Sequence, residues 1–235
     1  MQNKNHTSKR FDRELKALRD GLLAMGERAE QQIARAIDAV LRGDASLADQ
    51  VIAADAQIDQ DELGLDELAF FLLAQRQPVA SDLRLVMLAL KIVTDLERIG
   101  DLAVNVAKRG RELTQFQIPQ PLLEHLARLA AAVRKALRSA LEAFAGADAE
   151  RAEQVISGDR EIDTLNLDVI AHILSLGASS GHEVARSIGL SSVSRYLERI
   201  GDHATNIAEM VIYYVRGRDI RHHRARPRPG PRSAP

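Results

Sequence analysis

Leu96-Glu97-Arg98-Ile99-Gly100-Asp101 reads LERIGD, and the same six letters recur at 197–202. The repetition extends beyond this hexapeptide: DQVI at 49–52 is matched by EQVI at 153–156. Three further matches follow the hexapeptide in the same register, namely Ala103/Ala204, Asn105/Asn206 and Ala107/Ala208. The offset is 104 residues for the stretch at 49–52 and 101 for the hexapeptide, and matches that keep their order at nearly the same offset indicate an internal duplication of one structural unit.

Helical periodicity fills both copies of this unit. We expect helices at 12–41, 46–76, 81–113, 122–145, 149–176 and 182–216, with breaks at Gly43, Gln77-Pro78, Gly146 and 177–181. The segment 114–121, which holds two prolines, is the expected linker. The sequence therefore predicts an all-α fold of two tandem three-helix bundles, 11–113 and 122–217, packed in series as one elongated six-helix body. The Arg/Pro-rich tail 218–235 has little to bury and is expected to be disordered and solubilising.

Composition restricts the class of protein further. The 235 residues are 46% apolar and 28% charged with a net charge of −1, so no overall positive field predicts nucleic-acid binding. There is no Cys for disulfides or thiolate chemistry, no signal-peptide pattern, and no apolar run long enough for membrane insertion, so we expect a cytoplasmic protein. Nucleophile-elbow, Walker A and zinc-protease motifs are absent, and we expect no enzyme.

The third expected helix has two apolar stripes. At about 100° per residue, the broad core face consists of Leu85, Leu88, Ala89, Ile92, Leu96, Ile99, Ala103 and Val106. A second stripe consists of Val86, Leu90, Val93 and Val104. Glu97 falls within this second stripe, and Asp101 and Asn105 follow along its edge. Glu198, Asp202 and Asn206 repeat this arrangement in the second copy.

A matching line of acids follows the second expected helix of each copy. It consists of Asp55, Asp59, Glu62 and Asp66 in the first copy, and of Asp159, Asp163 and Asn166, then apolar Ile170, in the second. If the second and third helices pack antiparallel, Asp55/Asp59 face Glu97/Asp101, and Asp159/Asp163 face Glu198/Asp202. Oxygen ligands of this kind suit Mg²⁺, Mn²⁺, Ca²⁺ or iron. The alternative is a solvated charged face neutralised by Arg98 and Arg199.

Three other residues have two interpretations each. Gly100 and Gly201 lie inside helices, where glycine costs about 1 kcal/mol relative to alanine. We favour close approach of a neighbouring helix over room for an ion or a partner. His203 follows Asp202, but its counterpart Leu102 is apolar. A structural role is therefore expected for His203 rather than metal ligation.

Two longer runs resemble a known family. QPVASDLRLVMLALKIVTDLERIGDLAVNVAK at 77–108 and RYLERIGDHATNIAEMVIYYVRG at 195–217 are similar to the two signature helices of PhoU proteins. The resemblance covers about 11–217 and implies two three-helix bundles. It also implies acidic motifs that bind multinuclear iron or zinc clusters in some members, with manganese or magnesium as further candidates. Mapped onto this chain, those motifs are Asp55/Asp59, Glu97/Asp101, Asp159/Asp163 and Glu198/Asp202, with Asn105 and Asn206 as additional ligands.

The resemblance also implies a function. PhoU proteins act as negative regulators of phosphate uptake and of the phosphate-starvation regulon, linking the ATPase of the phosphate ABC transporter to a sensor histidine kinase, and members often form homodimers. Two alternatives remain open at this point. One is a carboxylate-bridged helical metalloenzyme, although the signature helices lack the Glu-x-x-His ligands such enzymes use. The other is a structural helical scaffold.

Overall fold

The computed structural model describes residues 3–177 and 180–217, and this part of the chain is helical apart from short connections. The six helices are α1 (Asn3–Arg42), α2 (Ala45–Arg76), α3 (Ala80–Leu113), α4 (Gln120–Gly146), α5 (Ala149–Ser175) and α6 (Gly181–Arg216). The predicted all-α fold is confirmed, and most helix ends lie within two residues of those expected. The tail 218–235, expected to be disordered, lies outside the described residues.

Two expected boundaries were wrong. The first helix begins at Asn3, well before the expected start at residue 12. The linker is 114–119 rather than 114–121, because α4 already begins at Gln120 and Pro121 lies in its first turn. Proline is tolerated there because its missing N–H would have no intrahelical acceptor in the first turn.

Equivalent caps begin the second helix of each repeat. The Asp44 carboxylate accepts a hydrogen bond from Leu47 N at 2.9 Å, and Asp148 accepts from the backbone N–H of Arg151 at 3.0 Å. The left-handed residue before each cap differs between the repeats. It is Gly43 with φ 62° in the first repeat but Ala147 with φ 49° in the second, and the predicted break residue Gly146 is instead the last residue of α4.

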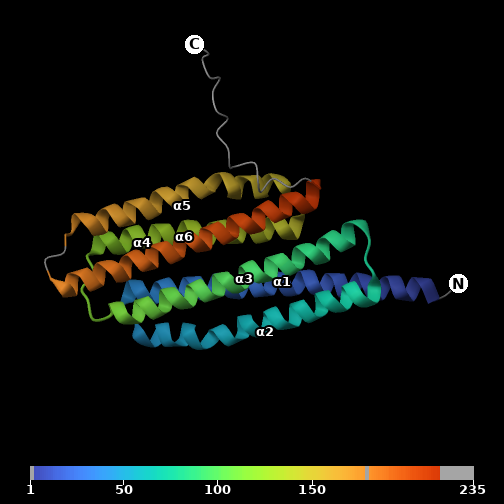
Figure 1. Ribbon diagram of the computed structural model, residues 1–235, viewed down its shortest axis with the longest axis horizontal. Coiled ribbons are helices and arrows are strands. Elements are labelled where there is room, and N and C mark those ends of the chain that lie inside the picture. Colours follow the sequence, from blue (N-terminus) through green and yellow to red (C-terminus); the bar gives the residue numbers. More distant parts are fainter. Residues whose placement is uncertain (1–2, 178–179, 218–235) are drawn as a thin grey trace, which may run out of the picture.

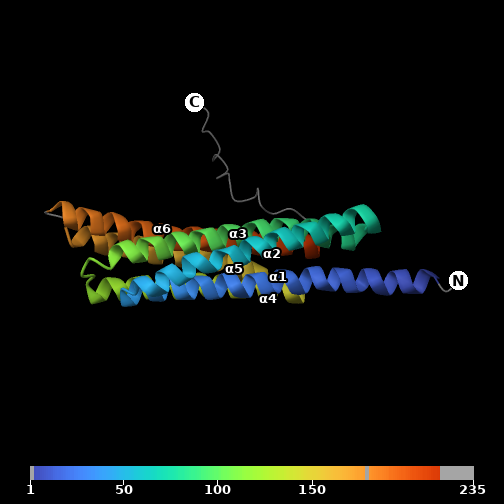
Figure 2. The same cartoon turned by 90° about the horizontal axis from the view of Figure 1, so that it is seen from below.

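The two bundles lie side by side along their length (Figures 1 and 2), which corrects the expected packing in series. Helix α3 runs antiparallel to α6, and α2 and α5 flank this pair on its outer sides, so that α2, α3, α6 and α5 form one layer. Helices α1 and α4 contact each other and form the second layer (Figure 2). Side-by-side packing buries an apolar face along each bundle, whereas end-to-end packing would bury only the tips.

The position of α3 explains its two apolar stripes. Helix α3 contacts α1, α2 and α6, so it must bury most of its circumference. All residues of the broad core face are buried, and so are Val86, Val93 and Val104 of the second stripe. On α2 the apolar residues Val51, Ile58, Leu65 and Leu72 recur every seven positions, a pattern that predicts a seam against neighbouring helices, and all four are buried. Periodicity alone therefore identified the residues of the core.

A charged contact also joins the two bundles on the α1–α4 side. Glu30 Oε1 on α1 lies 2.7 Å from Arg134 Nη2 and 2.9 Å from Arg138 Nη2 on α4. Burial opposes ionisation of Glu30, but the hydrogen bonds from both arginines hold the pKa of this carboxyl below its usual value. Within the described ranges, no helix is both long and apolar enough to cross a membrane.

Candidate functional site

Glycine in the third helix of each repeat allows the second helix to come close. A Cβ atom placed on Gly100 would lie 3.1 Å from Cδ1 of Ile58 and 3.5 Å from Oδ1 of Asp55. At Gly201 it would lie 3.0 Å from Cδ1 of Ile162. The interpretation of these glycines as points of close helix approach is confirmed. A consequence for the candidate site is that Asp55 on α2 lies next to the backbone preceding Asp101 on α3.

Close helix packing raises the pKa of two acids, Asp55 and Glu97, in the first acidic stripe, which we define as Asp55, Asp59, Glu97 and Asp101. Burial, then the neighbouring charges of Asp59 and Asp101, raise the pKa of Asp55 above its usual value. A hydrogen bond from Gln32 Nε2 to Asp55 Oδ1, 3.2 Å long, partly offsets this effect. The expectation that the acids of α2 and α3 face each other therefore agrees with the structure.

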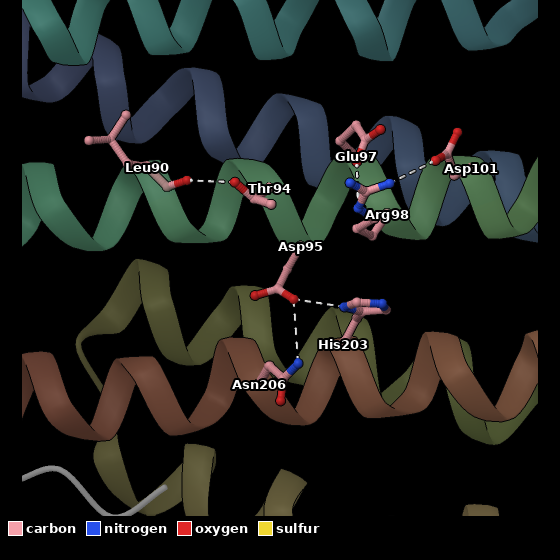
Figure 3. A network of polar contacts seen from close by, with 8 residues as sticks. All are labelled: Leu90, Thr94, Asp95, Glu97, Arg98, Asp101, His203 and Asn206. Carbon is pink, nitrogen blue, oxygen red and sulfur yellow. Dashed lines mark hydrogen bonds and ion pairs between the residues drawn. The ribbon is translucent and has the colours of Figure 1, made fainter.

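One arginine neutralises part of the first stripe. Arg98 Nε lies 3.3 Å from Glu97 Oε2, and Arg98 Nη1 lies 3.4 Å from Asp101 Oδ2 (Figure 3). The pKa of Glu97 is nevertheless raised, by burial first and then by the charge of Asp101. The alternative interpretation of the acids as a face neutralised by arginine thus holds in part for the first repeat.

Glu62 belongs to the same charged surface, although we had not assigned it as a ligand. Burial and the charges of Asp66 and Asp59 raise its pKa. The charge of Glu62 in turn contributes to the raised pKa of Glu97. Its place in the acid line of α2, at i+7 from Asp55, was the signal that could have identified it.

The second acidic stripe, defined as Asp159, Asp163, Glu198 and Asp202, has different neighbours from the first. In the part of the chain that the structure describes, no ion pair joins Arg199 to Glu198 or Asp202, whereas Thr205 Oγ1 donates a hydrogen bond to Asp159 Oδ1 at 3.1 Å. Burial, followed by the charges of Glu198, Asp159 and Asp163, raises the pKa of Asp202 to about 6. The two stripes are therefore alike in sequence but different in electrostatics.

The donor chemistry of both stripes fits a hard or borderline metal ion, because each offers four carboxylates on two adjacent helices. Among residues 3–177 and 180–217, no three Asp, Glu or His side chains are arranged to hold an ion together. Asn105 is half-buried on the same helix as Glu97, whereas Asn206 donates toward Asp95 Oδ1 at 3.5 Å. Metal ligation by the eight acids and two asparagines stays a prediction.

A polar network crosses the seam between the repeats (Figure 3). Asp95 on α3 points toward α6, and its Oδ1 lies 2.7 Å from Nδ1 of His203. The structural role expected for His203 agrees with this contact. Asp95 was not identified from the sequence. The available signal was that the two repeats differ at both positions: the counterpart of Asp95 is Tyr196, and the counterpart of His203 is Leu102.

Comparison with known proteins agrees with this architecture. A profile of the PhoU domain matches residues 22–110 and again 126–211, once in each bundle. The phosphate-specific transport system accessory protein PhoU homolog of Pseudomonas aeruginosa is 41% identical over 219 residues, which are 93% of this chain and 90% of that protein. The PhoU accessory protein of Escherichia coli K12 is 35% identical over 217 residues, 92% of this chain and 90% of that protein.

Solved structures give the same result. The crystal structure of PhoU from Pseudomonas aeruginosa superposes with a TM-score of 0.84 at 40% identity, covering 88% of this chain and all of that one. The phosphate transport system regulatory protein PhoU from Streptococcus pneumoniae gives a TM-score of 0.82 at 27% identity, with 89% and 99% coverage. These relatives are named as accessory or regulatory proteins rather than as enzymes. With the duplicated domain, the shared fold and the sequence identity in agreement, the chain belongs to the PhoU family.

Proposed function

We propose that this chain is a negative regulator of phosphate uptake and of the phosphate-starvation regulon. It acts as an adaptor between the ATPase of a phosphate ABC transporter and a sensor histidine kinase. The observation that carries this proposal is its similarity, at 35–41% identity over 92–93% of the chain, to proteins named as accessory to phosphate-specific transport. A cytoplasmic location and a homodimer belong to the same proposal.

The surface of the four-helix layer supports an adaptor role. Exposed apolar side chains recur at equivalent positions on its two outer helices, with Leu63 and Phe70 on α2 at 64% and 61% exposure. Their counterparts 104 residues later, Leu167 and Leu174 on α5, are 66% and 74% exposed. Exposed apolar side chains at equivalent positions of both repeats are typical of surfaces that bind folded partner proteins.

A deletion strain tests the adaptor proposal. In medium rich in phosphate, a strain lacking the gene should express a phosphate-starvation reporter such as alkaline phosphatase constitutively. The gene supplied on a plasmid should restore repression. Leu63→Glu/Phe70→Glu should fail to restore it while remaining folded by circular dichroism. Exchange of two exposed polar residues of the same helix, Gln57→Glu/Gln60→Glu, is the matched control and should restore repression. Normal repression in the deletion strain would contradict the proposal.

We further propose that the acidic stripes bind metal, with iron or zinc as the leading ions and manganese or magnesium as alternatives. The position of Asp202 beside Glu198, Asp159 and Asp163, whose charges raise its pKa, supports this, because a bound cation would relieve the repulsion. The residues that would hold it are Asp55, Asp59, Glu97 and Asp101 in the first stripe and their four counterparts in the second. When bound, the ion would supply positive charge and a fixed link between α2 and α3, or between α5 and α6.

Elemental mass spectrometry tests the metal proposal on protein purified without chelator or affinity tag. The wild type should carry stoichiometric metal, and a variant with alanine at Glu97, Asp101, Glu198 and Asp202 should carry none while keeping its helical content. Glu67→Ala/Asp168→Ala, which removes two exposed acids outside the stripes, should retain the wild-type metal content. Metal-free wild type, or equal content in all three proteins, would refute metal binding by the stripes and leave the adaptor proposal standing.

A further inference from the structure

An apolar groove lies where the N-terminal part of α3 meets the C-terminal part of α6, at one end of the molecule. Its volume is about 260 Å³. Leu88 and Met210 are buried beneath it, while three of its lining side chains remain open to solvent: Leu83 at 40%, Met87 at 46% and Tyr213 at 38% exposure. Apolar side chains left this accessible around a hollow mark a surface suited to binding.

Two cations line the same groove. Arg84 and Lys91 are exposed on α3, and neither forms an ion pair with any acid in the described parts of the chain. Seven residues separate them, which corresponds to about 10.5 Å along a helix at about 1.5 Å per residue. An occupant therefore meets an apolar strip bordered by two positive charges spaced two turns apart.

The internal duplication shows that this combination is specific to one end. The counterparts of Leu83 and Met87 are Val184 and Ile188, which are also exposed, at 44% and 60%. The counterparts of the cations are Ala185 and Ser192, and those of Met210 and Tyr213 are Arg109 and Glu112. Arg109 and Glu112 pair with each other at 2.5 Å. The second repeat thus keeps the apolar positions of α3 but has neither the two cations nor the apolar wall.

Size and charge together select the occupant. Small-molecule pockets usually measure about 300–1,000 Å³, so this groove is better matched to one or two inserted side chains than to a whole metabolite. The chain's own tail, 218–235, carries six arginines and one aspartate, and a second copy docked symmetrically through the same groove would present the same two cations. Both would be repelled by Arg84 and Lys91.

We propose that the groove binds an acidic amphipathic helix of a partner protein. Leu, Phe or Met side chains of that helix insert between Met87 and Tyr213, and two acidic residues seven positions apart pair with Arg84 and Lys91. A helix laid along α3 matches the spacing of the cations, as in other helix-in-groove complexes. The inference rests on the adaptor function proposed above and specifies the chemistry of one of its partner segments.

A peptide library tests the groove on the purified, full-length chain. A displayed library of random 16-residue peptides is selected against the protein, and enriched sequences are synthesised with a fluorescent label for anisotropy titration. The expected enrichment is for Leu, Phe or Met at helical spacing with Asp or Glu seven residues apart. Arg84→Glu/Lys91→Glu should weaken binding at least tenfold, and a peptide with its acids changed to Lys should regain affinity for that variant.

The second repeat supplies the matched control. Ala185→Glu/Ser192→Glu adds negative charge at the equivalent positions and should leave peptide binding within twofold of wild type. No enriched peptide, enrichment without acids, or equal loss in both variants would refute the proposal. The proposal would also be refuted if a chain ending at Gly217 bound the peptide at least tenfold more tightly than the full-length chain does, because that result would identify the tail as the occupant. A sedimentation change in Arg84→Glu/Lys91→Glu would identify a second copy instead.

Only the purified chain and the peptide take part in this assay. Normal repression in the deletion strain would therefore refute the adaptor proposal without affecting the proposed groove site. Absence of peptide binding would refute the groove site without affecting the adaptor proposal.

Discussion

Substitution of Asp202 by Asn should stabilise the metal-free protein above pH 6. The folded state raises the pKa of Asp202 from 3.8 to about 6, chiefly by burial and then by the charges of Glu198, Asp159 and Asp163. The folded protein therefore binds this proton more tightly than the unfolded chain does. Between pH 4 and pH 6 the wild type should lose stability as the pH rises, because only the unfolded chain has already released the proton.

The expected size of this effect follows from the same pKa values. A difference between about 6 and 3.8, at about 1.36 kcal/mol per pKa unit, sets an upper limit of about 3 kcal/mol above pH 6. Asp202 is only partly desolvated: burial is the main cause of its raised pKa, yet its side chain still reaches solvent at the surface, so solvent screening reduces the expected gain for Asp202→Asn to about 1 kcal/mol. At pH 4 most of this gain should disappear.

Urea unfolding followed by far-UV circular dichroism measures this gain at pH 4 and pH 7.5, with chelator present to exclude divalent ions. Asp168→Asn removes an exposed acid of α5 outside the stripe and serves as the control, with no expected dependence on pH beyond that of wild type. An Asp202→Asn variant no more stable than wild type at pH 7.5, or equally stabilised at both pH values, would refute the electrostatic argument. If the stripe binds a cation, adding that ion should reverse the order of stability, because it favours the carboxylate.

Further substitutions test three features of the fold: the left-handed residues, the contact between the repeats and the core. Ala147→Gly should raise the free energy of unfolding by about 1 kcal/mol, because alanine is strained at φ 49°, and Gly43→Ala should lower it by a similar amount. Urea unfolding measures both, and a lower free energy of unfolding for Ala147→Gly would contradict this. His203→Ala should cost about 1–3 kcal/mol by leaving the half-buried Asp95 without its main partner, and additive costs in a double-mutant cycle with Asp95→Ala would show that the contact is not coupled. Leu126→Ala, at a fully buried position of α4, should cost about 2–5 kcal/mol by leaving a cavity, and a thermal midpoint within a degree of wild type would argue against that packing.

Most of the fold was predictable because it depends on local patterns. Apolar spacing identified all six helices, and the seam of Val51, Ile58, Leu65 and Leu72 is buried as its period required. One local detail was not predictable. Nothing in the sequence distinguished Gly146 from Ala147 as the left-handed residue, because alanine normally avoids positive φ.

The arrangement of the two repeats could not be derived from periodicity. Helix α3 has apolar residues around most of its surface, which shows that it is central but not which helix lies against each side. The contact of Asp95 with His203 could not be predicted for the same reason, because the two residues are far apart in sequence and come together only when α3 packs beside α6.

The candidate site was predictable in composition and less so in electrostatics. Spacing brought the acids of α2 and α3 together correctly, and the structure adds Glu62 to them. The difference between the stripes was not visible in the sequence, since Arg98 and Arg199 occupy identical positions in LERIGD. Only the packed structure shows that Arg98 pairs with Glu97 and Asp101.

The antiparallel seam of α3 and α6 has the geometry of a two-fold interface between identical subunits, here joined by the six residues 114–119. In a true symmetric pair every contact occurs twice, so a residue cannot change on one side only. Covalent linkage removes that restriction. Asp95 pairs with His203, but the counterparts of these residues, Tyr196 and Leu102, do not form such a pair. Two identical halves in a symmetric pair would have to form the Asp95–His203 contact twice or not at all. Linkage also makes assembly of the two halves independent of protein concentration.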